Sequence, residues 1–179
     1  MIDGEEDADL VARCLQGEVE AFEPLVIRYQ RVLFNVAWRM LGDREDARDV
    51  VQGAFVKAWE KLGTFDPHYR FFSWIYRIVV NESLNARGRR PPLDPLLADV
   101  AAPGGPEDEL RSRERMDGLQ TALLCLAEPD RQVIVLRHFA ELSYAEIGDT
   151  LGLAEKTVKS RLHEARQRLG RALQSGACQ

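Results

Sequence analysis

The sequence predicts an all-α protein made of two helical domains joined by a proline-rich linker. Apolar residues recur three or four positions apart along most of the 179 residues, as on one face of an α-helix. No run of alternating β-branched residues predicts a strand. Five of the eight prolines fall between Pro91 and Pro106, where they exclude a long helix. We therefore expect helical domains at residues 1–90 and 119–179, with a linker at 91–118.

The N-terminal domain is predicted to begin with a short helix at about residues 8–15 and a long one at 22–40. Pro24 falls near the first turn of the long helix, where a missing amide is tolerated, and Gly42 ends the helix. The apolar face of this helix comprises Phe22, Leu25, Val26, Tyr29, Val32, Leu33, Val36, Ala37 and Met40.

Two more helices complete the N-terminal domain. Asp43 is placed to cap the next helix, whose apolar positions run at helical spacing from Ala47 to Leu62, and Gly63 ends it. A fourth helix is predicted at about residues 72–86. Four helices with short connections predict a compact bundle.

The C-terminal domain contains a pattern typical of a helix-turn-helix. Ser143 and Glu146 have the spacing of a capping box, in which the two side chains satisfy the first amides of a helix. Gly152 provides the turn. The second helix has a buried stripe at Val158, Leu162, Ala165 and Leu169, and basic residues on its other faces. Such a helix can enter a DNA major groove and bond phosphates and base edges.

Charge is distributed unevenly along the chain. The net charge is −5, and residues 1–23 hold eight acidic residues and one basic one. Residues 68–90 instead hold five arginines against one acid, and residues 155–171 hold six lysines or arginines against two acids. Two basic patches, one in each domain, thus lie in an otherwise acidic protein. This polarity predicts a second partner besides DNA, or a protein that binds DNA weakly when alone.

Residues 65–76 concentrate more aromatic rings than one buried stripe can hold. Arginines are interleaved among the rings, and this combination suits unpaired bases, which stack on rings while their phosphates are neutralised. We expect Phe72, Ile75 and Ile78 to be core residues. Tyr69, Trp74, Tyr76 and Asn81 are candidate DNA contacts.

Several functional classes lack support in the sequence. The three cysteines and three histidines are scattered, so we expect no metal site, and we expect no cofactor. Paired carboxylates, a Ser-His-Asp arrangement and a phosphate-binding glycine loop are absent at a convincing spacing, so we expect no enzyme. The unpaired cysteines, and the lack of a signal peptide or long apolar span, predict a cytoplasmic protein without membrane insertion.

Four segments together resemble the bacterial sigma-70 family, and in particular an extracytoplasmic-function (ECF) sigma factor of the sigma-E type. Residues 46–59 are similar to the helix that grips the clamp of RNA polymerase, and residues 72–82 to the element that melts and reads the minus-ten sequence. Residues 126–137 resemble the start of the fourth conserved region, and 142–169 its minus-thirty-five reader. Gly53, Ala154 and Glu164 depart from the family pattern.

The resemblance implies a role for each of three sets of residues. The first set would bind core RNA polymerase: Asp49, Gln52, Phe55, Lys57 and Trp59. The second would hold the melted minus-ten strand: Phe65, Tyr69, Arg70, Trp74, Tyr76, Arg77 and Asn81. The third would bind the minus-thirty-five duplex: Thr157, Lys159, Ser160, Arg161, His163, Arg166 and Arg168. An anti-sigma factor is a further expected partner, and it could tether the protein to a membrane.

A two-domain regulator that binds duplex DNA without polymerase is the alternative interpretation. Such regulators end in a similar helix-turn-helix. They do not account for the rings around Trp74.

Overall fold

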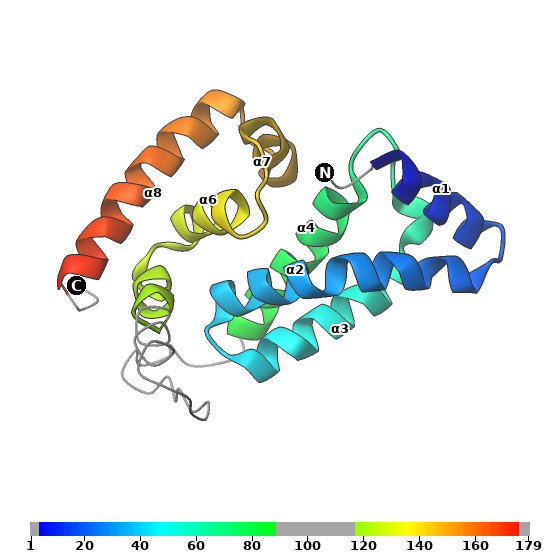
Figure 1. Ribbon diagram of the computed structural model, residues 1–179, viewed down its shortest axis with the longest axis horizontal. Coiled ribbons are helices and arrows are strands. Elements are labelled where there is room, and N and C mark those ends of the chain that lie inside the picture. The colour runs from blue at the N-terminus through cyan, green and yellow to red at the C-terminus, as the bar shows by residue number, and fades with distance from the viewer. Residues whose placement is uncertain (1–3, 89–116, 176–179) are drawn as a thin grey trace, which may run out of the picture.

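The computed structural model describes residues 4–88 and 117–175. Within these ranges all the regular secondary structure is helical, and short loops join the helices (Figure 1). The predicted all-α fold is therefore confirmed. Of the predicted linker only residues 117 and 118 are described, and they belong to a helical segment at 117–125. The rest of the linker lies outside the described residues.

The N-terminal half is the expected bundle. Its elements are α1 (Gly4–Leu15), η1 (Val19–Phe22), α2 (Glu23–Leu41), α3 (Arg44–Glu60), η2 (Leu62–Thr64) and α4 (Phe71–Gly88). Gly42 ends α2 in the left-handed conformation, with φ of 84°, which glycine adopts without steric cost. Asp43 caps α3 as predicted, since its Oδ1 accepts from the amides of Glu45 at 2.8 Å and Asp46 at 2.9 Å.

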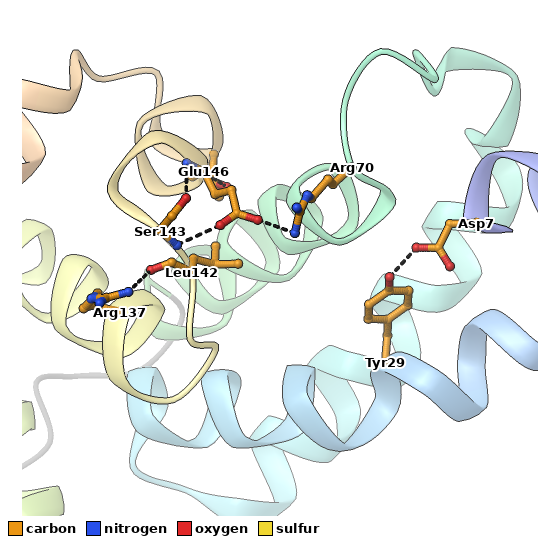
Figure 2. Close-up of polar contacts among 8 residues, drawn as sticks. Asp7, Tyr29, Arg70, Arg137, Leu142, Ser143 and Glu146 are labelled. Atoms are coloured by element: carbon orange, nitrogen blue, oxygen red, sulfur yellow. Dashed lines mark hydrogen bonds and ion pairs between the residues drawn. The ribbon is translucent and has the colours of Figure 1, made fainter. Parts of the chain in front are cut away.

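Helix α1 is joined to α2 through a buried carboxylate. The hydroxyl of Tyr29 donates to Asp7 (Figure 2). Arg28 forms an ion pair with the same carboxylate. Burial raises the pKa of Asp7 above its ordinary value, although the bonds from Tyr29 and Arg28 oppose the shift. The acidic N-terminal segment is thus part of the bundle.

The C-terminal half contains the segment 117–125, α6 (Glu128–His138), α7 (Tyr144–Leu151) and α8 (Glu155–Ser175). The capping box at the start of α7 is present as predicted, and Gly152 ends α7 in the left-handed conformation with φ of 68°. The buried side of α8 consists of Val158, Leu162 and Ala165, with Leu169 partly buried beside them. These two helices and their turn form the expected helix-turn-helix.

The two halves share one hydrophobic core, which the division of the sequence into two helical domains did not indicate. The buried apolar residues of both halves form one continuous cluster, with α6 against α2 and α7 against α4. Gln120 also joins the halves, because its Oε1 accepts from Arg39 at 2.9 Å and its Nε2 donates to the carbonyl of Trp38 at 3.0 Å. The guanidinium of Arg39 lies between the rings of Trp38 and Phe139, at 4.3 and 4.6 Å.

Other sequence-based expectations concern metals, membranes and cysteines. Within residues 4–88 and 117–175, no three His, Cys, Asp or Glu side chains are grouped so that they could hold a metal ion. No helix of the described chain has an apolar stretch long enough to cross a bilayer. Cys14 is a buried free thiol, in keeping with the unpaired cysteines expected from the sequence, whereas Cys125 is disulfide-bonded and contradicts that expectation.

Candidate polymerase and nucleic-acid interfaces

The outer side of α3 carries a stripe of exposed side chains. Asp49, Gln52, Val56 and Trp59 are exposed, and their spacing places them along one side of the helix. Val56 and Trp59 are 54% and 38% exposed, and the Trp59 ring packs edge-on against Phe22 at 5.2 Å. We call these four residues the α3 stripe. Val56 is not among the residues predicted for this surface, although its position between Gln52 and Trp59 at helical spacing indicates it.

Two residues predicted on this surface lie elsewhere. Phe55 is buried, with its ring against Phe22 at 6.3 Å, because it shares the inward side of α3 with Val51 and Ala58. Lys57 is half-buried, and its Nζ forms an ion pair with Glu82 of α4 at 2.6 Å. The assignment of Phe55 to a docking surface is corrected, because its ring is part of the core. Lys57 keeps an exposed part of its side chain, so its assignment stays a prediction.

The aromatic segment divides into a packed cluster and one free ring. Phe65, Phe71 and Trp74 contact one another, with ring centroids 5.6 to 5.7 Å apart. Phe65 and Trp74 are half-buried, and Phe71 is fully buried. Tyr69 is 52% exposed and is available for stacking. The expected core positions Phe72 and Ile75 are buried, and Ile78 is partly buried against the core.

Tyr76 lies in the core and cannot contact DNA there. Its side chain is fully buried and stacks on Phe72 with centroids 6.0 Å apart, because residues four positions apart share a helix face. Its hydroxyl has no hydrogen-bond partner among the described residues, and burial raises the pKa of the phenol. No strand can stack on this ring in the present arrangement, so the assignment of Tyr76 is corrected.

Arg70, just before α4, and Arg77 of α4 both contact α7. Arg70 forms an ion pair with Glu146 (Figure 2). Arg77 donates its Nε to the carbonyl of Thr150 at 2.9 Å and a terminal nitrogen to the carbonyl of Asp149. A cavity of about 460 Å³ lies beside these contacts, between α4, α6 and α7, and it is lined by Tyr76, Arg77, Val80, Asn81, Leu84, Gln132, Thr150, Leu151 and Gly152.

Glu146 forms contacts with both halves of the molecule. One carboxylate oxygen accepts from the amide of Ser143 at 2.7 Å, and the other pairs with Arg70 (Figure 2). Burial acts to raise the pKa of Glu146, but the hydrogen bonds at Ser143 and the charge of Arg70 outweigh it, so the pKa lies below the ordinary value. The predicted capping box explains only the first of these contacts.

The exposed sides of α8 hold most of the predicted duplex-binding residues. Thr157, Lys159, Ser160, His163 and Arg166 are exposed, and Arg161 is half-buried. The Nζ of Lys159 pairs with Glu155 at 2.6 Å and also lies 5.5 Å from the ring of Tyr144. Most of these side chains lie outside the buried stripe, and Arg161 lies at its edge, three positions after Val158. A major groove could receive this part of the helix.

Arg168 and Arg166 make contacts within the protein. Arg168 forms an ion pair with Asp130 of α6, whose side chain is only 7% exposed, and reaches Glu164 at 3.3 Å. The charge of Arg168 neutralises a buried carboxylate, so we expect its main effect on stability, and its assignment to a DNA phosphate stays a prediction. Arg166 lies 3.2 Å from Nε2 of His138. Glu164, a departure from the family pattern, lies beside Arg168.

Comparisons with known proteins identify the family. The Sigma-70 region 2 model matches residues 25–90, and the Sigma-70 region 4 model matches residues 116–169. The chain is 34% identical to the RNA polymerase sigma-H factor of Pseudomonas aeruginosa, over 97% of both chains. The chain belongs to the ECF sigma factors of the sigma-70 family. The protein is thus a transcription initiation factor that works with RNA polymerase on promoter DNA.

Other relatives of this ECF sigma factor support the same conclusion. The ECF sigma factor SigW of Bacillus subtilis is 33% identical, over 88% of this chain and 91% of that one. The ECF sigma-E factor of Escherichia coli K12 is 35% identical, over 94% of both.

Solved structures resemble this ECF sigma factor along most of its length. CnrH, in complex with the cytosolic domain of CnrY, matches with a TM-score of 0.75 and 30% identity, over 98% of this chain and 100% of that one. The sigma factor RpoE of Bartonella quintana, in complex with the anti-sigma factor NepR, matches with a TM-score of 0.66 and 26% identity, over 86% of this chain and 96% of that one.

Proposed function

We propose that this ECF sigma factor uses three separate surfaces to start transcription. The α3 stripe docks on the clamp of core RNA polymerase, the start of α4 with its preceding loop holds the melted minus-ten strand, and α8 enters the minus-thirty-five major groove. Residues 1–90 and 119–179 act as the two functional domains, and residues 91–118 connect them along the polymerase.

The α3 stripe has the chemistry of a helix-docking surface. An exposed tryptophan and valine flanked by Asp49 and Gln52 offer apolar contact with polar groups at the edge. A partner helix can bury the two apolar side chains while Asp49 and Gln52 remain hydrogen-bonded. Trp59 supports this proposal most strongly, because tryptophan is enriched among residues that dominate binding energy.

The exposed ring of Tyr69 is the observation that carries the minus-ten assignment. Tyr69 lies next to Arg70, and Arg77 and Asn81 follow on exposed positions of α4. Stacking on an exposed ring contributes about 1 to 3 kcal/mol per base, comparable with the few kcal/mol that unpairing costs. A ring beside two arginines can therefore hold an unpaired base and neutralise its phosphates. The half-buried Trp74 and Phe65 would form the wall behind that base.

On α8, Lys159, Ser160, Arg161 and His163 are the proposed base readers, with Thr157 and Arg166 toward the backbone of the duplex. Their donors suit guanine edges and phosphates. No step in this scheme requires covalent catalysis by the chain. The protein would act in the bacterial cytoplasm, where promoter DNA and polymerase are found.

An anti-sigma factor is the proposed regulator of this ECF sigma factor. The RpoE structure that it resembles was solved with the anti-sigma factor NepR, and the CnrH structure with the cytosolic domain of CnrY. We expect a similar protein to bind this chain and to block access to polymerase. A membrane-anchored anti-sigma factor would also hold it at the membrane.

The experiment that tests the proposed function is run-off transcription with core polymerase and a candidate promoter. The wild-type chain is expected to give a promoter-dependent transcript, and Trp59→Ala is expected to reduce both the transcript and the affinity for core polymerase. Arg48→Ala, an exposed change on α3 outside the stripe, is the matched control. A chain that binds duplex promoter but never core polymerase would support the duplex-only regulator instead.

A further inference from the structure

Helix α1 carries a buried carboxylate on its apolar face. Leu10, Val11 and Cys14 are buried at helical spacing, and Asp7 lies on the same face with only 1% of its surface exposed. Burying a carboxylate costs free energy that an apolar side chain at this position would not cost. A residue that breaks the local pattern in this way indicates a specific contact rather than general packing.

The contact of Asp7 is with the hydroxyl of Tyr29, a fully buried residue of α2 (Figure 2). Arg28 forms an ion pair with the same carboxylate and a second one with Glu6 at 2.7 Å. The hydroxyl is the only polar group of the Tyr29 side chain. The bond to Asp7 therefore fixes how the ring lies between α1 and α4.

The Tyr29 ring supports the rings behind the proposed base-binding surface. It packs against Phe71 and Phe72, the first two residues of α4, with centroids 5.7 and 5.8 Å apart. Phe71 in turn contacts Phe65 and Trp74, each at 5.6 Å. Helix α1 itself packs against η2, which directly precedes Phe65, and against α4. Both ends of the segment 65–71 are thus held by α1 and Tyr29.

The residues between these two ends form a compact turn. The amide of Tyr69 donates to the carbonyl of Asp66 at 3.0 Å, and the amide of His68 donates to Oδ1 of Asp66 at 3.0 Å. A turn closed by its own hydrogen bonds keeps its shape when its ends move. The place of the exposed Tyr69 ring therefore depends on how Phe65 and Phe71 are held.

We propose that Asp7 and Tyr29 are positioning residues of the minus-ten site. Their hydrogen bond holds the Tyr29 ring against Phe71, and Phe71 holds the turn so that Tyr69 receives an unpaired base. A ring that is already in place loses less conformational freedom when DNA binds. The inference rests on the proposed role of Tyr69, and it adds a function for the acidic N-terminal helix.

The sharpest variant is Tyr29→Phe, which removes the hydroxyl and keeps the ring. Asp7→Ala removes the other side of the bond, whereas Asp7→Asn keeps an amide oxygen that can still accept from Tyr29. Val36→Ala is the matched control. It creates a small cavity at a buried position of α2 two turns beyond Tyr29, away from the hydrogen bond.

The experiment uses holoenzyme made from core polymerase and the full chain, on a promoter that the wild type transcribes. Permanganate reactivity of unpaired thymines measures the open complex at a temperature where every variant is folded. We expect Tyr29→Phe and Asp7→Ala to reduce the open complex about three- to tenfold, the range for one lost hydrogen bond, and Asp7→Asn to reduce it less. Val36→Ala should match the wild type, and the affinity for core polymerase should be the same for all variants.

A double variant separates positioning from a loss of stability. If the Tyr29 hydroxyl acts through the Tyr69 ring, Tyr29→Phe causes no further loss of open complex when Tyr69 is already alanine. Its effect on the melting temperature, in contrast, remains in that background. Equal losses of open complex in both backgrounds would overturn the positioning role, and so would an equal loss in Val36→Ala.

The single variants distinguish this inference from the proposed function. If Tyr69→Ala reduces the open complex and Tyr29→Phe does not, the positioning role is wrong and the base contact stands. If Tyr69→Ala has no effect, the proposed base contact is wrong and the positioning role fails with it.

Discussion

The basic helices α4 and α8 have similar charge but different surroundings. On α8, the candidate readers Thr157, Ser160 and His163 are exposed, and the side chains of Ser160 and His163 bond to Thr157 and Gln167 of the same helix. On α4, the two candidate arginines are engaged by another helix of the same chain. A count of positive charges predicts two equivalent DNA-binding surfaces. The structure instead has one surface that is open and one that is partly covered.

The difference follows from what lies opposite each helix. Helix α8 packs its apolar stripe on α6 and α7 and leaves its basic side outward. Helix α4 is packed on two sides, with α2 and α3 on one and α7 on the other. The order of events we infer is recognition of the duplex by α8 first and capture of the melted strand by α4 second.

The largest expected effect is the loss of stability when the buried ring of Tyr76 is removed. Tyr76→Ala should lower the free energy of unfolding by about 3 to 5 kcal/mol, because removal of a fully buried ring leaves a cavity. Tyr76→Phe should leave stability unchanged or raise it, since the hydroxyl has no partner among the described residues. Urea unfolding of both variants checks this. Equal stability of wild type and Tyr76→Ala would contradict the burial of this ring.

Tyr69→Ala is expected to act on DNA and leave the fold intact. The ring is half exposed, so its loss should not change the melting temperature, but it should cost about 1 to 3 kcal/mol of single-strand binding. Permanganate reactivity of unpaired thymines in a promoter complex with core polymerase measures the loss of open complex. If Tyr69→Ala opens promoters as well as wild type, the free ring is not the stacking surface.

Two arginines on α8 provide a matched pair. Arg161→Ala should weaken duplex promoter binding by about 1 to 3 kcal/mol, the range for a base-edge contact, with polymerase binding unchanged. Arg168→Ala should lower the melting temperature, because Asp130 loses its partner. Electrophoretic mobility shifts and thermal melts of both variants test this difference. The reverse result, with Arg168 required for DNA and Arg161 for stability, would support Arg168 as a phosphate contact.

Local signals in the sequence predicted most of the helices but not the contacts between the halves. Ser143 and Glu146 are three residues apart, so their capping box could be predicted, and both bonds are present. The pairing of Glu146 with Arg70 joins residues far apart in sequence, and no spacing rule indicates it. Tyr76 is an intermediate case. Its position four residues after the buried Phe72 predicts the inner face, and the number of rings nearby obscured that signal.

The same limit applies to the candidate polymerase surface. The spacing of Asp49, Gln52 and Trp59 follows one side of a helix and could be recognised before the fold was known. Whether Phe55 and Lys57 share that side depends on where the core lies. Their contacts with Phe22 and Glu82 are tertiary, so the resemblance to a family segment could not separate docking residues from packing residues.

The smallest expected effect is a pH dependence of the contact between the two halves. The folded-state pKa of Glu146 lies below the ordinary value of 4.5, so the ionised form stabilises the folded chain. This contribution is fully present above the unfolded pKa and is lost as the pH falls through the lower folded pKa. Glutamine cannot titrate, so the difference in melting temperature between wild type and Glu146→Gln should be constant near neutral pH and shrink below about pH 4.5. Glu141→Gln, which changes an exposed carboxylate of the same half, is the matched control. Melting curves recorded across this range measure the trend, and a difference that stays constant down to the acid limit of folding would mean that the charge of Glu146 does not hold α7 against α4.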